Sequence, residues 1–511
     1  MNLMLALDTL ESVKRSTRSS LLWQQLAIQA GKLQGNERQR LLEDIAACPL
    51  ESAEAEWLRC SAMAELTHDT AWYARQALQA SEATLPDALM SLLGLAWHHG
   101  LARTQPPTAM VHALQKIDLP RLQSLVARQL PRRQATEPRQ PPGRLRIAIY
   151  TPHVANPTHG GTMFTLNVMS ALNEDLADIH TFAAQENNIP AVGSYHGGNE
   201  AVQPVIVQPE TLRLKRPGHC QLLLPDVEFS VRARFEQMRQ AIDDFAPDVV
   251  FFVGFLSPLI FDLYERYPVV GLSIHSLPPL APVDVWLSAD PEANAACWPG
   301  LPVPQTFDFP QRFWPGAPVT PIDRGQLGLP VSATLLISVG FRLEVELTPE
   351  WQERMLQLLE RHPDVHWLLV GVREEIPSDA LPQHVRIYRA PLQSHIEAWL
   401  AASDIFINPP RIGGGSAVAL AMEQGLAVAS MNTGDGGDKL GPYGASSVDD
   451  YFTRLQAWVE HPELRREIGA ALKTRFHERL DFSTTLAAQG LLAACNQAIA
   501  AFQQRKETAC D

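Results

Sequence analysis

The residues with the clearest capacity for chemistry lie in a glycine-rich stretch toward the C-terminal end. Residues 405–430 read IFINPPRIGGGSAVALAMEQGLAVAS, which predicts a short apolar strand, a turn, a helix and a second strand. The glycines Gly413–Gly415 can adopt backbone conformations closed to other residues, and the helix would direct its first free N–H groups at the turn. Such a helix N-terminus attracts anions, and Arg411 and Ser416 flank it. The pattern predicts a phosphate site, most simply for the diphosphate of a nucleotide.

The alternative for this stretch is a tight strand–helix turn beside a surface arginine. Three consecutive glycines, with Gly414 in the middle, exceed what such a turn requires, so we favour phosphate binding.

Length and composition limit the classes of protein that this chain can be. With 511 residues and 46% apolar residues, it should fold into two to four globular domains. Its net charge of -14 argues against general nucleic-acid binding but leaves room for a nucleotide pocket, which needs only local positive charge.

The cysteines and the apolar runs predict where the protein resides. No cysteine pair has CxxC or zinc spacing, which indicates reduced thiols. The N-terminal apolar run is too short for a signal peptide, and no stretch approaches about 18 uninterrupted apolar residues. We therefore expect a soluble cytoplasmic protein without a membrane span, for which peripheral membrane contact remains open. The cysteines are Cys48, Cys60, Cys220, Cys297, Cys495 and Cys510.

The character of the sequence changes several times along the chain. Residues 1–130 show helical spacing of apolar residues and no convincing strand, which predicts a helical domain. Residues 131–143 are rich in proline and arginine and predict an extended linker; its basic run could contact an anionic partner, but a solvated linker is the simpler interpretation. Apolar strands then alternate with helices over 144–320 and again over 321–482, and residues 483–511 predict a helix.

These alternations predict an α/β fold with two Rossmann-like domains in tandem, preceded by an all-helical domain. Gly160 and Gly161 follow the first strand of the first α/β domain, and Gly413–Gly415 follow a late strand of the second. Because ligands of open α/β sheets bind outside the carboxyl ends of the strands, we expect the two turns to face each other across a ligand cleft.

From 144 to 482 the chain resembles the GT-B glycosyltransferases that use nucleotide sugars, in particular those of families 4 and 1. The segments that carry the resemblance are, in order, RIAIYTP with HGGTMFTLNVMSAL, VVGLSIHSLPPLAP, SVGFRLEVE, NPPRIGGGSAVALAMEQGLAVAS and HPELRREIGAALKTRFHERLDF. The resemblance implies a transferase of hexose type that moves a sugar from a nucleotide sugar, such as a UDP-sugar, to a glycan, lipid-linked or protein acceptor. It implies no cofactor besides this substrate.

The resemblance also assigns roles to residues. His275 stands where such enzymes often place an active-site histidine, and Arg342 where they usually place a phosphate-binding cation. Gly160 and Gly161 match the glycine loop on the acceptor side. Lys439 could replace a lysine that the family usually carries a few residues after Arg342.

The chain departs from the family at the glycine-rich stretch. The family usually has two glutamates here, and alignment puts Ile412 and Leu420 in their places. Leucine cannot accept a hydrogen bond, so the ribose must be held by other groups. Glu423 is close in sequence, but helical spacing turns it away from Leu420.

The developing charge on a departing nucleoside diphosphate can be stabilised by helix N-termini together with Arg342 and Arg411. No Asp-x-Asp pair lies in a promising loop, so we expect no metal at the site. Weaker candidates for contact with substrates are His153, His159, Asp284, Asp435 and Asp438.

Two other functions remain open at this point. The missing glutamates favour a non-catalytic GT-B scaffold that binds a nucleotide or a protein partner. A sugar-nucleotide epimerase can share the fold, but the helical extension and the Arg-x-Gly-Gly-Gly loop fit it less well.

Overall fold

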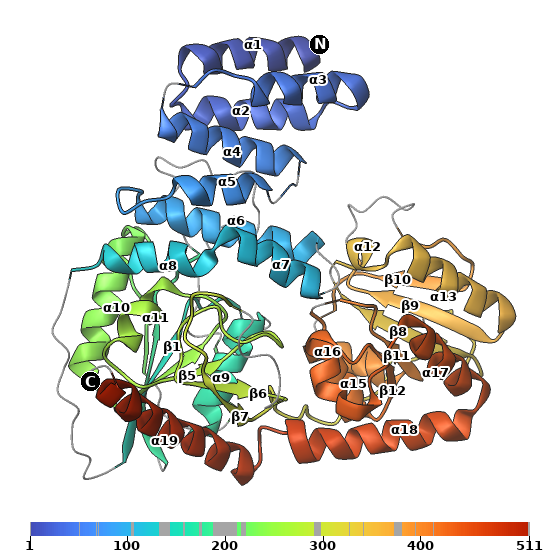
Figure 1. Cartoon of the computed structure of the whole chain (residues 1–511). Coiled ribbons are helices and arrows are strands. Elements are labelled where there is room, and N and C mark those ends of the chain that lie inside the picture. The colour runs from blue at the N-terminus through green and yellow to red at the C-terminus, as the bar shows by residue number, and fades with distance from the viewer. Residues whose placement is uncertain are drawn as a thin grey trace.

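Figure 1 shows the computed structural model, in which a helical part is followed by two α/β domains. The predicted linker lies outside the described residues except for Pro131, and Ile412 also lies outside them. The structure describes residues 2–50, 52–67, 69, 71–103, 107–131, 144–156, 159–172, 176–187, 212–215, 221–290, 298–325, 328–340, 342–372, 381–393, 395–411 and 413–508.

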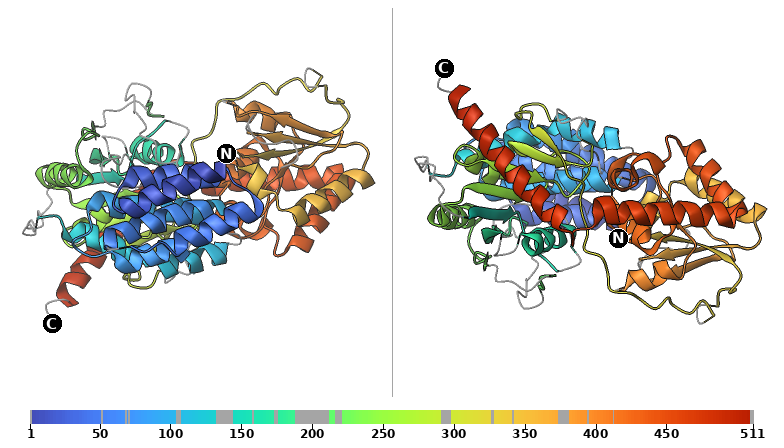
Figure 2. Two further views of the ribbon diagram at one scale, coloured as in Figure 1. Left: turned by 90° about the horizontal axis from the view of Figure 1, so that it is seen from above. Right: turned by 90° about the horizontal axis from the view of Figure 1, so that it is seen from below.

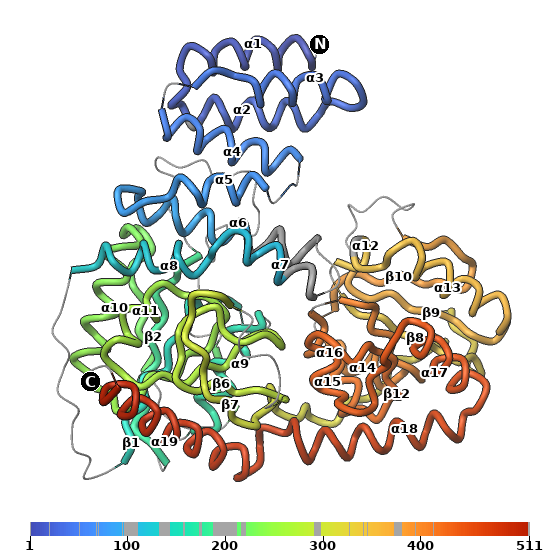
Figure 3. The backbone as a smooth tube through the Cα atoms, in the orientation of Figure 1, coloured from blue at the N-terminus to red at the C-terminus, as the bar shows by residue number. Residues whose placement is uncertain are grey.

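The N-terminal part is a stack of helices above the first sheet (Figures 1 and 3). Apolar residues recur every three or four positions; in the last helix of the stack, for example, Leu119, Leu122 and Val126 are buried. The helices are α1 (Asn2–Arg15), α2 (Ser20–Gly31), α3 (Gly35–Ala46), α4 (Ala53–Thr67), α5 (Ala71–Gln79), α6 (Pro86–Arg103), α7 (Pro107–Ile117) and α8 (Leu119–Arg128).

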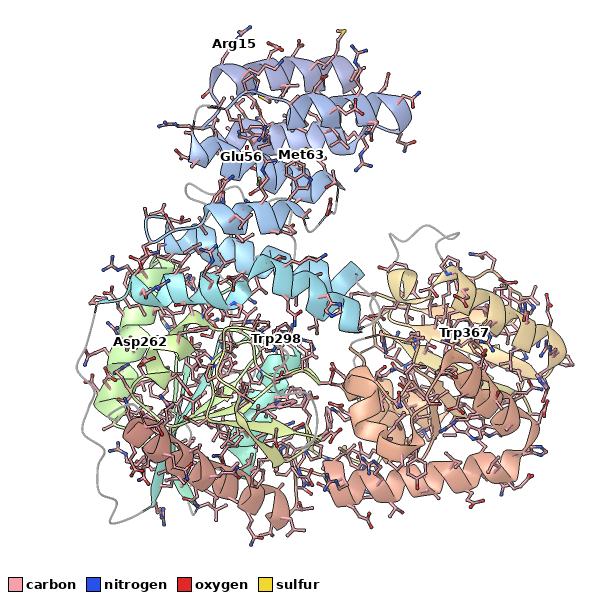
Figure 4. All side chains as sticks on the ribbon, viewed as in Figure 1. Arg15, Glu56, Met63, Asp262, Trp298 and Trp367 are labelled. Carbon is pink, nitrogen blue, oxygen red and sulfur yellow. The ribbon has the colours of Figure 1, made fainter. Side chains whose placement is uncertain are left out.

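The helical stack shares a hydrophobic core with the first α/β domain. Helix α8 packs against α11 (Pro258–Tyr264), and the buried Gln123 donates a hydrogen bond of 2.6 Å to the carbonyl of Leu280. Trp298, which Figure 4 labels at this seam, donates from its indole nitrogen to the carbonyl of Pro278 over 2.9 Å. The stack is therefore fixed to the first domain by packing and by hydrogen bonds.

The first α/β domain contains a parallel sheet with the strand order β3-β2-β1-β4-β5-β6-β7. Strands β4, β5 and β6 are buried along their whole lengths, as expected for apolar strands with helices on both faces. The strands are β1 (Leu145–Thr151), β2 (Ala177–Ala183), β3 (Gln221–Leu223), β4 (Val249–Val253), β5 (Val269–Leu272), β6 (Val285–Ser288) and β7 (Gln305–Asp308), and the helices besides α11 are α9 (Gly160–Ala171) and α10 (Val231–Phe245).

The second α/β domain contains a five-stranded parallel sheet with the order β10-β9-β8-β11-β12. The prediction of two tandem Rossmann-like domains after a helical domain is thus confirmed. The strands are β8 (Thr334–Val339), β9 (Val365–Val370), β10 (Ile387–Ala390), β11 (Ile405–Ile407) and β12 (Ala427–Ala429), and the helices are α12 (Leu343–Glu346), α13 (Pro349–Arg361), α14 (Ile396–Ala401), α15 (Gly415–Gln424), α16 (Gly434–Leu440) and α17 (Val448–Glu460).

The last two helices tie the domains together. Seen from below in Figure 2, α18 (Pro462–Arg475) runs under the second domain and α19 (Thr485–Thr508) returns under the first. By length and composition α19 could span a membrane, but its apolar face lies in the core of the first domain and Arg505 bonds Asp284 at 3.0 Å. The weaker candidate Asp284 is therefore an anchor for α19.

Loops at the carboxyl edge of the first sheet are held by a buried carboxyl group. Glu186, which is 1% exposed, accepts hydrogen bonds at Oε1 from Tyr150 and from Ser257, the latter at 2.5 Å. Its backbone N–H donates to the carbonyl of Pro152 at 2.8 Å. Its other oxygen, Oε2, is buried without a partner among the described residues. One carboxyl thus joins the loops after β1, β2 and β4.

The Glu186 network predicts a pH dependence of stability. Burial raises the pKa of Glu186 to about 8, against the opposing hydrogen bonds from Ser257 and Tyr150, whereas an unfolded glutamate titrates near ~4.3. The folded chain therefore keeps a proton that the unfolded chain has lost. The free energy of unfolding should fall as the pH rises from about 4.5 to 8, by at most about 1.4 kcal/mol per unit. In Glu186→Gln this contribution disappears.

Thermal denaturation between pH 5.5 and 8.5 measures the effect. The melting temperature of the wild type should fall relative to that of Glu186→Gln as the pH rises, while the exposed control Glu467→Gln follows the wild type. Parallel curves for all three proteins would contradict a neutral buried carboxyl at Glu186.

Candidate active site

The glycine turn lies at the carboxyl edge of the second sheet, between β11 and α15. Gly414 has φ +91, which favours glycine, and a Cβ there would stand 2.5 Å from Nε of Arg411. A Cβ on Gly415 would stand 2.9 Å from the carbonyl oxygen of Asp435. Close packing therefore requires two of the three glycines, which is a structural reason that the sequence did not reveal.

Arg411 is a brace for this edge of the sheet. Its side chain is 4% exposed, and it donates from Nη1 to Glu346 at 2.6 Å, from Nε to Asn408 at 2.8 Å and from Nη2 to the carbonyl of Val339 at 2.9 Å. These bonds join the ends of β8 and β11 to α12. All three nitrogens of Arg411 thus bind protein partners, so it supports this edge of the sheet, while its contact with a phosphate stays a prediction.

Arg342 holds the more accessible charge at this corner. Its side chain is 24% exposed, and its Nη2 pairs with Glu346 at 3.0 Å and lies 3.4 Å from where a Cβ on Gly413 would stand. A guanidinium has five N–H donors in a planar fork, so one edge can bind Glu346 while another binds a phosphate. Arg342 and Arg411 thus share the one carboxylate of Glu346.

Helix α15 adds backbone donors beside Arg342. It begins at Gly415 after Gly414, and no side chain caps its first N–H groups. Ser416 and Gly413 are partly exposed at this end. An uncapped N-terminus of a ten-residue helix next to an arginine is suited to an anion.

Helix α16 brings the second domain against the first. Asp435 accepts from the backbone N–H of Ser276 at 2.7 Å and lies 3.4 Å from Nδ1 of His275. Burial by itself would raise the pKa of Asp435, but the hydrogen bond and charge of His275, the charge of Lys439 and the Ser276 N–H together hold it below its usual value. Asp435 thus holds the ring of His275 through Nδ1, one of its two nitrogens.

Lys439 lies buried in the same contact between the two domains. It is 0% exposed and donates at 2.8 Å to Oε1 of Gln311, which in turn donates from Nε2 to the carbonyl of Ser273 at 2.7 Å. Burial lowers the pKa of Lys439. Lys439 thus bridges the two domains, and its predicted role in donor binding stays a prediction.

On the side of the first domain, the loop after β1 leads into α9. His159 caps this helix, since its Nδ1 accepts from the N–H of Thr162 at 3.3 Å, and burial lowers its pKa. The rings of His153 and His159 lie 4.6 Å apart. A Cβ on Gly160 would meet no atom within 4 Å, whereas one on Gly161 would lie 3.2 Å from the His159 ring. Packing among the described residues therefore gives no reason for a glycine at Gly160.

Neither Leu420 nor Glu423 places a carboxylate at the glycine turn, where the family usually has its glutamates. Leu420 lies partly buried in the core of the second domain, and Glu423 accepts from the N–H of Gly316 at 2.6 Å, away from the glycine turn. An ion pair of Arg342 with Glu346, four residues on, was an alternative that the sequence offered, whereas the contacts of Arg411 with Asn408 and with the distant Glu346 were not predicted. The signal that could have found Asn408 is its place directly after β11, three residues before Arg411.

No family model and no curated protein matches the chain. Among solved structures, a mutant of the O-GlcNAc transferase of Thermobaculum terrenum is similar over 99% of this chain and 98% of that one, with a TM-score of 0.59 and 13% identity. A glycosyltransferase of Rickettsia africae ESF-5 is similar over 70% of this chain and 99% of its own, with a TM-score of 0.48 and 12% identity. The first alignment includes the helical stack as well as both sheets. The chain therefore has a GT-B glycosyltransferase fold with a helical domain in front.

Proposed function

We propose that the protein is a glycosyltransferase that moves a sugar from a nucleotide sugar to an acceptor hydroxyl. One observation carries the proposal: Arg342 and the uncapped N-terminus of α15 converge at the carboxyl edge of the second sheet, next to the helix that contacts His275 of the first domain. Nucleotide diphosphates suit such a corner, because it offers a forked cation and free backbone donors together.

In the proposed reaction the bond between the sugar and the diphosphate breaks, and its electron pair leaves with the phosphate oxygen. The acceptor oxygen forms the new bond to the sugar and gives up its proton. Arg342 and the N-terminus of α15 would stabilise the charge that develops on the diphosphate. Arg411 would act indirectly by holding Glu346 and the glycine turn in place. This electrostatic arrangement supports a reaction without a metal.

His275 is proposed to contact the reacting groups through Nε2. Asp435 engages Nδ1 and thereby fixes both the tautomer and the direction of the ring. The edge of the Phe255 ring packs against His275 with centroids 5.5 Å apart, which restrains the imidazole from a second side.

The acceptor is proposed to be a protein or a glycan. The helical stack supports a large acceptor, because it shares the core of the first domain and so extends the acceptor side as one body. The structure that aligns over 99% of the chain is named as an O-GlcNAc transferase, which supports transfer of a sugar to oxygen. Buried reduced thiols at Cys48, Cys60 and Cys495 support a cytoplasmic location.

A nucleotide-binding scaffold without catalysis is the second candidate. It is favoured by Leu420 in place of a carboxylate and by the internal use of Arg411 and Lys439. Both candidates require a nucleotide at the same corner, so turnover separates them.

A panel of nucleotide sugars tests the proposal. The protein is incubated with UDP-, GDP- and dTDP-linked hexoses, together with serine- and threonine-containing peptides or with oligosaccharides, and the released nucleoside diphosphate is measured. We expect one donor to raise the melting temperature and to be turned over. A thermal shift without turnover would support the scaffold, and neither response would refute both functions.

Substitution of the two arginines should separate binding from support. Arg342→Ala should weaken binding of the nucleoside diphosphate roughly 10- to 100-fold through loss of a charge-assisted contact, with a small effect on stability. Arg411→Ala should lower the free energy of unfolding by about 3–5 kcal/mol, because Glu346 would remain buried with fewer partners.

Isothermal titration calorimetry with the diphosphate and chemical denaturation measure the two effects. The exposed Arg466→Ala, on α18, serves as the control that changes neither. Equal loss of affinity and stability in both arginine variants would argue against the division of roles.

A further inference from the structure

Helix α16 carries a second carboxylate whose surroundings differ from those of the first. Asp438 follows Asp435 by three residues, and side chains at this spacing lie on the same face of a helix. Asp435 on that face contacts His275 and Ser276 of the first domain. Asp438 therefore faces the boundary where the two α/β domains meet.

The carboxylate of Asp438 is not used by the fold. It is partly buried, yet no hydrogen bond to it exists within the described part of the chain. The other acidic residues near this boundary are engaged: Asp435 with His275 and Ser276, and Asp308 with Arg479 at 2.6 Å. A partly buried carboxylate without partners costs free energy, and such groups are found where function needs them.

The charges around Asp438 come from both domains. Burial raises its pKa, the charge of Lys439 opposes this, and the charges of Asp435 and of Asp290, at the end of β6, raise it further, so that it lies at about 7. From α18, Arg475 donates to the backbone carbonyl of Lys439 at 2.8 Å. A carboxylate with this affinity for protons can accept one at neutral pH more readily than Asp435, whose pKa is held low.

We propose that Asp438 is the base that takes the proton from the acceptor hydroxyl during sugar transfer. The inference rests on the proposed function. As the acceptor oxygen bonds to the sugar, its proton passes to a carboxylate oxygen of Asp438, and the electron pair of the broken bond leaves with the nucleoside diphosphate. His275, fixed by Asp435, contacts the substrates from the first domain, and Asp438 accepts the proton from the second.

The inference assigns proton transfer and does not replace the family's missing glutamates. Leu420 leaves the ribose to other groups, whereas α16 adds a carboxylate at the interdomain boundary. The tight approach of Gly415 to Asp435 fixes α16 against the glycine turn, so Asp438 has a set position relative to the proposed diphosphate corner.

The test compares Asp438→Asn, which keeps the shape of the side chain but cannot accept the proton, with the wild type. The control is Asp449→Asn, at an exposed carboxylate on α17. We measure kcat and KM from pH 5.5 to 8.5 with the donor that the wild type turns over, and the affinity for its nucleoside diphosphate by calorimetry. In Asp438→Asn, kcat should fall about 10²–10⁴-fold and the limb of kcat/KM that rises near pH 7 should flatten.

The affinity of Asp438→Asn for the diphosphate should stay within about twofold of the wild type, and circular dichroism should show a folded protein, because the change removes repulsion from Asp290 and Asp435. An unchanged kcat and pH profile would overturn the role of Asp438 alone. Loss of diphosphate affinity with unchanged kcat would also overturn it, by making Asp438 a donor contact. A wild type that turns over no donor would overturn the proposed function and this inference together.

Discussion

The buried carboxylate of Glu346 is the interaction on which the second domain's site depends. It binds Arg411 on one side and Arg342 on the other, and through them it connects the short helix after β8 with the turn after β11. Buried ion pairs gain little net stability, because both charges lose their hydration. Their geometry is nevertheless strict. Here that geometry keeps one arginine inside the fold and leaves the other beside the glycine turn, where a diphosphate could reach it.

The second constraint is the contact between the two α/β domains. Asp435 and Lys439 of α16 reach His275, Ser276 and Gln311 of the first domain, and α19 returns to the first domain through Arg505. The proposed sugar transfer needs the donor and acceptor sides, which lie in different domains, to be held at a fixed distance. These polar contacts lie beside a buried hydrophobic cluster that includes residues of both domains, such as Phe251 and Val418, so apolar packing and polar contacts together set that distance.

The fold was predictable because its signals are local. Runs such as VVFFV in β4 are apolar along their whole length, and helices with a 3.6-residue period separate them, so the alternation could be read directly. The position of the glycine turn was predictable for the same reason. The partners of the charged residues were not: Arg411 meets Glu346 across 65 positions of sequence, and Lys439 meets Gln311 across 128. The sequence displays these two cations but not the distant groups that bind them, whereas Arg342 and Glu346, four positions apart, are a pair that helical spacing predicts.

The protein contacts of Arg411 and Lys439 change the charge balance of the proposed site. Once Arg411 is paired with Glu346 and Lys439 is buried against Gln311, the accessible positive charge comes from Arg342 and the N-terminus of α15. The ionised Asp435 beside Gly415 is offset by the charges of His275 and Lys439, and Leu420 adds no further carboxylate. A base at Asp438 that holds a proton for much of the time near pH 7 also adds little negative charge. The absence of the family's glutamates therefore matches the small number of accessible cations at this site, because a site with less positive charge requires less negative charge to balance it.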